Sequence, residues 1–140
     1  MKISAKVNYA IKAIFELALH YEGKRPLQVD AISRSEGIPS NFLMQILLRL
    51  KNSGLVTSAR GSLGGYLLAK DPSEIRLADV IQAVDSSFLS EPRLLSKSQV
   101  SDQVINKVFG EAHLGMMKNL EINFENLMAE HQSSTLIYQI

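Results

Sequence analysis

Apolar residues with a helical spacing mark the segment from Ile38 to Gly54. Four of them repeat at the i, i+3, i+4, i+7 spacing of one buried helix face: Leu43, Ile46, Leu47 and Leu50. Ser40 is the expected N-cap, and Gly54 is the expected stop, because glycine adopts the left-handed conformation at little cost. The pattern therefore predicts one amphipathic helix.

The opposite face of this helix is mostly polar. At 100° per residue it carries Asn41, Gln45, Leu48, Arg49 and Asn52. Amides and arginine form the hydrogen bonds that read base edges in the major groove of DNA. For the helix taken alone, a solvated polar face explains the same pattern. The next segment is therefore needed to distinguish a solvated face from a DNA-reading face.

Two short strands around a glycine-rich turn follow the helix. We expect strands at Leu55 to Ala59 and at Gly65 to Ala69, joined by the basic turn RGSLGG. A helix, a glycine stop and a basic hairpin form a winged helix-turn-helix, whose helix enters the major groove while its wing follows the DNA backbone. The alternative is a phosphate-cradling loop, but no Lys-Ser or Lys-Thr follows the glycines and the next segment is a strand.

The remaining apolar pattern of the first half completes this domain. Ser4 to Tyr21 is predicted as the first helix and Val29 to Ser35 as the second, and Leu77 to Val84 adds a third amphipathic helix after the wing. Leu27 is predicted to form a short strand, with Ile75 beside it.

The candidate DNA-contacting residues come from the first helix, the reading helix and the wing. Two lysines near the chain start would favour a phosphate at a helix N-terminus, although ordinary exposed lysines are an equal alternative. The candidates are Lys2, Lys6, Ser40, Asn41, Gln45, Arg49, Arg60, Gly61, Ser62, Gly64 and Gly65.

The second half of the chain has a different pattern. Ser86 to Gln103 is rich in serine and reads as a loop, whereas Asn106 to Glu130 reads as the longest helix. Four apolar residues of that helix form the expected dimer interface: Met117, Leu120, Phe124 and Leu127. We expect a DNA-binding domain over 1–85, a linker over 86–103, and a dimerisation helix with its tail over 104–140.

Charge supports this division. The first 78 residues hold eleven Lys and Arg against six Asp and Glu, while the remainder holds four against eight. A basic half joined to an acidic half is typical of a polyanion-binding module with a separate partner-facing module, although ordinary scatter is the alternative.

Other compositional features exclude several classes of function. The chain has no cysteine, shows no secretory leader and no membrane-length apolar run, and is expected to be cytoplasmic. We find no catalytic triad, metal-binding helix or phosphate loop, so we do not expect an enzyme.

Several motifs together resemble one family. The opening helix NYAIKAIFELAL, the turn AISRSEGIPSNFL, the wing RGSLGGY and the helix EIRLADVIQAVD are similar to the Rrf2 family of bacterial winged-helix regulators, over roughly residues 1–85. The resemblance implies a mainly α fold with a small β-wing, a DNA-binding regulator and a C-terminal dimerisation helix.

The chain departs from this family at two places. Cluster-binding members hold three cysteines within the segment equivalent to Ser86 to Gln103, and this chain has none, so no cofactor and no metal are expected. Some relatives carry a glutamate, linked to DNA-site choice, where this chain has Met44, so their operator sequence does not transfer.

The sequence thus predicts a homodimeric winged-helix transcriptional regulator, acting as a repressor on a pseudo-palindromic operator in double-stranded DNA. The alternative is a winged helix that serves as a protein-interaction module without specific DNA binding. A small-molecule effector or a partner enzyme that conveys the signal is compatible with the first function, and nothing in the sequence identifies either one.

Overall fold

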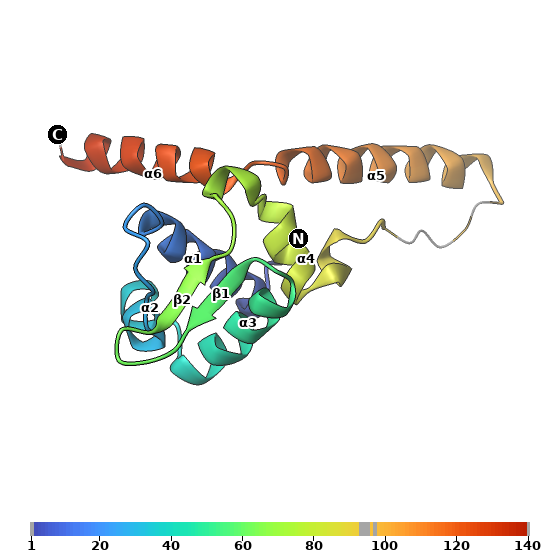
Figure 1. The fold of residues 1–140 in the computed structure, drawn as a ribbon. Helices are drawn as coiled ribbons and strands as arrows, with labels where there is room; N and C mark the ends of the chain where they lie inside the picture. The colour runs from blue at the N-terminus through green and yellow to red at the C-terminus, as the bar shows by residue number, and fades with distance from the viewer. Residues whose placement is uncertain (1, 93–95, 97, 140) are drawn as a thin grey trace.

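The computed structural model describes residues 2–92, 96 and 98–139, and Figure 1 shows their arrangement. Over these residues the chain forms six α-helices, two short 3-10 helices and a two-stranded antiparallel wing. The elements in chain order are α1 (Ala5–Leu19), α2 (Val29–Glu36), α3 (Ser40–Asn52), β1 (Val56–Ala59), β2 (Gly65–Leu68), η1 (Pro72–Glu74), α4 (Leu77–Val84), η2 (Ser86–Leu89), α5 (Val100–Asn119) and α6 (Phe124–Gln139). This confirms the predicted mainly α fold with a β-wing.

Helix α1 is the centre of the core. It contacts α2, α3, α4, α6 and β2, and its fully buried Ala10 and Ala13 leave room for neighbouring helices to approach closely. The four predicted apolar residues of α3 are all buried in this core. Each such side chain contributes about 1.5–3 kcal/mol through burial, so the apolar pattern sets the orientation of α3.

The turn between α2 and α3 fixes where the reading helix begins. Gly37 ends α2 with a φ of 67°, and the Ser33 hydroxyl donates to the Ile38 carbonyl. Pro39 occupies the N-cap position, so the prediction that Ser40 is the N-cap is wrong. Ser40 is the first helical residue, and its hydroxyl donates to the Ser33 hydroxyl at 3.3 Å, which joins the two helices.

Leu27 forms an isolated β-bridge with Tyr66 of the wing, where the sequence predicted a short strand. Leu27 and Tyr66 exchange two backbone hydrogen bonds of 2.9 and 2.8 Å. The placement of Ile75 beside Leu27 is wrong: the Ile75 carbonyl accepts from the Phe124 amide at 3.0 Å. The 3-10 turn η1 directs this part of the chain toward the C-terminal segment instead.

The C-terminal region forms two helices, and the prediction of one continuous helix from Asn106 to Glu130 is wrong. The break is held by the start of α4, where the Leu77 amide donates to the Ile122 carbonyl and the Ala78 amide donates to the Leu120 carbonyl, each at 2.9 Å. The Asn123 side chain then accepts from the Asn126 amide at 2.9 Å and so begins the next helix.

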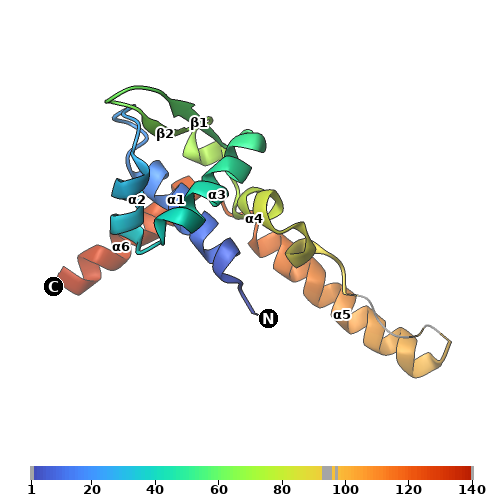
Figure 2. The same ribbon diagram turned by 90° about the horizontal axis from the view of Figure 1, so that it is seen from below.

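The two C-terminal helices have different environments. Helix α6 contacts α1, and its Phe124 is fully buried in the core of its own chain, with Leu120 and Leu127 packed partly against the same core. Placing Phe124 in a dimer interface is therefore wrong. Helix α5 has no buried residue and extends away from the remainder of the fold (Figures 1 and 2).

The predicted linker from Ser86 to Gln103 is shorter in the structure. It begins with the 3-10 helix η2, and α5 already begins at Val100. The Asp102 carboxylate accepts from the Gln99 amide at 3.2 Å, which stabilises this earlier start. Part of the predicted loop, 93–95 and 97, lies outside the described residues.

Candidate nucleic-acid interface

Helix α3 packs beside strand β1 of the wing. The helix and the turn of the wing both lie toward the bottom of Figure 1, and Figure 2 views the molecule from below. All five side chains predicted for the open face of α3 are exposed, because the four apolar residues on the other side hold the helix against the core. The candidates Ser40, Asn41 and Gln45 are therefore exposed on the helix that packs beside the wing.

The wing is a short hairpin with a closely packed glycine turn. Strand β1 pairs with β2 from Val56 opposite Leu68 to Ala59 opposite Gly65. Gly64 is buried, and a Cβ atom there would lie 2.4 Å from the Ala59 carbonyl oxygen. The other turn candidates, Gly61 and Ser62, are exposed. The structure therefore assigns Gly64 a packing role and leaves the exposed turn available to a ligand.

A substitution at Gly65 is expected to disrupt the wing. Gly65 has a φ of 141°, and a Cβ atom on it would lie 2.3 Å from the Leu27 carbonyl oxygen, which accepts the Tyr66 amide. Gly65→Val should lower the free energy of unfolding by about 2 kcal/mol or more, through strain and loss of this bridge, and should abolish tight DNA binding. Thermal unfolding and a DNA titration measure the two effects.

The matched control for this substitution is Gly61→Ala. Gly61 also has a positive φ, of 100°, but a Cβ atom there meets nothing within 4 Å. The control variant should show only the backbone cost of about 1 kcal/mol. Equal stability of Gly65→Val and the native chain would contradict the role of the Leu27 bridge in holding the wing.

The basic candidates outside the wing have different surroundings. Arg49 donates from Nη1 to the Val84 carbonyl at 3.1 Å, so its guanidinium is tied to the end of α4. The Ser87 hydroxyl, together with the nearby Lys6 charge, holds the pKa of the Asp85 carboxyl below its ordinary value. Lys6 and Arg49 therefore both lie near the end of α4, while Lys2 is exposed near the chain start.

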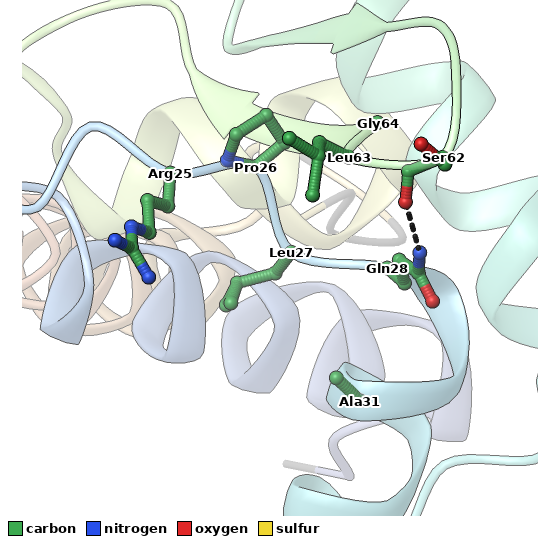
Figure 3. Close-up of a pocket in the computed structure, with 8 residues that line it drawn as sticks. All are labelled: Arg25, Pro26, Leu27, Gln28, Ala31, Ser62, Leu63 and Gly64. Atoms are coloured by element: carbon green, nitrogen blue, oxygen red, sulfur yellow. Dashed lines mark hydrogen bonds between the residues drawn. The ribbon is translucent and has the colours of Figure 1, made fainter.

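An open groove of about 550 Å³ separates the wing turn from the start of α2 (Figure 3). Arg25, Pro26 and Leu27 line one side, and Ser62, Leu63 and Gly64 line the other. Arg25 is exposed at its edge, and so is Arg60 at the base of the turn. Two basic side chains thus lie near the exposed wing turn, where the DNA backbone is expected.

Two positioning residues were missed by the sequence reasoning. Gln28 donates from Nε2 to the Ser62 carbonyl at 3.3 Å across the groove, and Lys51 donates from Nζ to the Ser58 hydroxyl at 2.8 Å. The first bond links the wing turn to α2, and the second links the wing to α3. Their partners are 34 and 7 residues away in the chain, and no local pattern signals either contact.

Solved structures share this fold over nearly the whole chain. The chain is similar to the structure of T. potens IscR, with a TM-score of 0.75 and 29% identity, over 96% of this chain and 90% of that one. It is also similar to CymR, the global cysteine regulator of B. subtilis, with a TM-score of 0.83 and 25% identity, over 93% of this chain and 98% of that one.

Curated relatives match the chain over 87 residues. The HTH-type transcriptional regulator IscR of Photorhabdus laumondii is 46% identical over 87 residues, which cover 62% of this chain and 52% of the relative. The IscR protein of Escherichia coli K12 is 44% identical over 87 residues, again 62% of this chain, and 53% of that relative. The chain thus spans about half the length of the curated relatives it matches.

The sequence model of the Rrf2 family, described as an iron-dependent transcriptional regulator, matches residues 3–130. The residues of this chain do not fit iron–sulfur ligation, because it has no cysteine thiolate. Within the part of the chain that the structure describes, no three His, Asp or Glu side chains come together as a metal site. No described helix has the length and apolar character needed to cross a bilayer.

The family match covers most of the chain, and the solved relatives share both the reading head and the C-terminal helices. The protein therefore belongs to the Rrf2 family of transcriptional regulators.

Proposed function

We propose that this protein is a homodimeric, sequence-specific repressor that binds a pseudo-palindromic operator. The observation that carries the proposal is the environment of α5. A helix of 20 residues, about 30 Å long, extends from the DNA-reading domain with no buried side chain, although it carries several large apolar residues. An exposed apolar helix of this size marks a contact with another protein surface.

The exposed apolar residues form a broad stripe along α5. Six large side chains are at least half exposed: Val100, Val104, Ile105, Val108, Phe109 and Leu114. Three of them, Val100, Val104 and Val108, repeat every four residues, so they lie on the same side of the helix. This surface replaces Phe124 in the proposed interface, and the half-buried Met117 lies at its C-terminal end.

A second copy of the chain is the partner that suits this stripe. One reading helix contacts only a few base pairs, too few to select one site among the million or more in a genome. Two-fold pairing through α5 would double the reading surface and place the two α3 helices about 34 Å apart, or a multiple of that spacing, along the duplex. The operator is therefore proposed to be a pseudo-palindrome.

Different parts of the reading surface are proposed to make different kinds of contact with DNA. Asn41 and Gln45, on the open face of α3, would read base edges, and Arg60 would enter the minor groove beside the wing. Lys2 and Arg25 would contact phosphates, which position the protein without reading sequence. Repression follows from occupancy, because a dimer bound at a promoter blocks the same DNA to polymerase.

The test of this function is selection of binding sites from duplexes with 20 random base pairs, using the full chain. The selected site should contain two inverted half-sites, and a reporter promoter carrying it should fall in output when the protein is expressed. Selection of duplexes without a common sequence would contradict specific reading. A rise in reporter output would contradict repression.

Arg60→Ala is expected to weaken binding to the selected site by about 1–3 kcal/mol per contact while the fold stays intact. Arg60 is exposed beside the wing turn and contributes nothing to the core, so thermal unfolding should not change. Gln45→Ala is the matched comparison: it should change which sequence is preferred more than the affinity for random DNA. Full affinity and unchanged site preference after Arg60→Ala would show that the wing does not contact the operator.

A further inference from the structure

Two apolar side chains stand among the polar residues on the open face of α3. Met44 and Leu48 are 57% and 56% exposed and are one helical turn apart. Neither belongs to the core cluster, which holds Leu43, Ile46, Leu47 and Leu50 on the other side of the helix. Phe42 is exposed as well, but its ring packs edge-on to Tyr9 with 6.4 Å between the ring centres.

The apolar pair has a regular relation to the amides beside it. Met44 follows Asn41 by three residues, and Leu48 follows Gln45 by three residues, so each amide has an apolar neighbour at the same helical spacing. The two pairs repeat four residues apart along α3. Contact with solvent alone gives no physical reason for this repeat of apolar side chains.

The major groove offers one apolar feature for such side chains. Asparagine and glutamine form paired hydrogen bonds to adenine N6 and N7, while the thymine in the same base pair presents its C5-methyl group beside that edge. An amide with an apolar neighbour at i+3 can therefore contact both halves of an A·T pair. We propose that Met44 and Leu48 read thymine methyl groups in A·T pairs whose adenines bind Asn41 and Gln45.

This inference rests on the proposed DNA-binding function and is more specific than it. It requires at least one A·T pair in each half-site and an affinity that depends on the methyl groups. An apolar patch that served another protein would give no such dependence. Leu63, which is 88% exposed in the wing turn and lies outside α3, supplies a matched apolar control.

The experiment replaces thymine by deoxyuridine in the selected operator, one half-site position at a time. Deoxyuridine keeps every hydrogen bond of the base pair and removes only the methyl group. Loss of one buried methyl contact should weaken binding of the native chain about fourfold, and symmetric replacement in both half-sites should weaken it roughly tenfold or more.

The variants Met44→Ala and Leu48→Ala assign the contact to each side chain. Each variant should bind the thymine operator more weakly and lose the deoxyuridine penalty at one position, whereas Leu63→Ala should keep the full penalty at every position. Both substituted side chains are mostly exposed, so thermal unfolding should match that of the native chain.

The possible failures of the two proposals are distinguishable. If the native chain selects no common sequence, the proposed specific DNA binding is wrong. If it selects a clear operator but binds the thymine and deoxyuridine forms equally, or if the selected half-sites contain no A·T pair, then methyl reading is wrong while specific DNA binding stands. A penalty that persists in both Met44→Ala and Leu48→Ala would also overturn the assignment.

Discussion

Binding to duplex DNA is expected to weaken on the order of 10³-fold when the salt concentration rises from 50 to 200 mM, if the dimer contacts at least six phosphates. Each contact displaces a condensed counterion, and this release becomes less favourable as salt rises. The first 78 residues hold five more basic than acidic groups, and Lys2, Arg25 and Arg60 are exposed. Three phosphate contacts per subunit, one for each of these side chains, would therefore give the six contacts that the dimer needs.

The slope of log affinity against log salt concentration identifies the residues that contact phosphates. Arg60→Ala should reduce the slope by about one phosphate per subunit, because a guanidinium in the minor groove also neutralises the phosphates that flank it. Lys118→Ala, which removes an exposed charge from α5, should leave the slope unchanged. A flat titration of the native chain over this range would show that binding is not dominated by phosphate contacts, and equal slopes for all three proteins would remove Arg60 from the phosphate-contacting surface.

The reading head was predictable because its signals are local. The apolar spacing of α3 and the stop at Gly54, which has a φ of 78°, both appear in the structure as the sequence indicates. The strands of the wing differ from the prediction by one residue at one end of each. These features arise within a few residues of chain, so the pattern of side chains contains nearly all the information that determines them.

The C-terminal half was less predictable because its break is imposed from a distance. Leu120 and Phe124 keep the spacing of an uninterrupted apolar helix face, so the sequence pattern continues through the break. The interruption depends on backbone amides of Leu77 and Ala78, more than 40 residues earlier in the chain. The same fact explains the error at Phe124: helical spacing shows that a residue is buried, and it does not show which surface buries it.

The candidate site shows the same division between local and distant determinants. Exposure of Asn41 and Gln45 follows from the helix alone. The link from Gln28 to the wing turn and the link from Arg49 to the end of α4 depend on the tertiary arrangement. The first contact constrains the position of the wing relative to α2, and the second constrains the position of α4 relative to α3. Both contacts therefore affect how well α3 and the wing can bind one duplex at the same time.

Val104→Glu combined with Val108→Glu is expected to give a folded monomer that binds the palindromic operator at least about 10²-fold more weakly than the native chain. Both residues are 59% exposed on α5, so the substitution leaves the core of each subunit untouched. In the proposed dimer it places four carboxylates in an apolar interface, where unpaired charges cannot be accommodated. Phe124→Glu is unsuitable for this test, because Phe124 is fully buried in its own chain.

The loss of DNA affinity follows from losing the second reading head. In a dimer the second half-site is bound at a high effective concentration, which raises overall affinity by 10²–10⁴-fold over a single head. Light scattering at micromolar concentration should give twice the chain mass of 15.5 kDa for the native protein and a single chain mass for the variant. Asn126→Glu with Gln132→Glu adds the same charge at exposed polar positions outside α5 and should remain dimeric and bind fully. A native mass near 15.5 kDa, or a variant that still dimerises, would show that α5 does not form the interface.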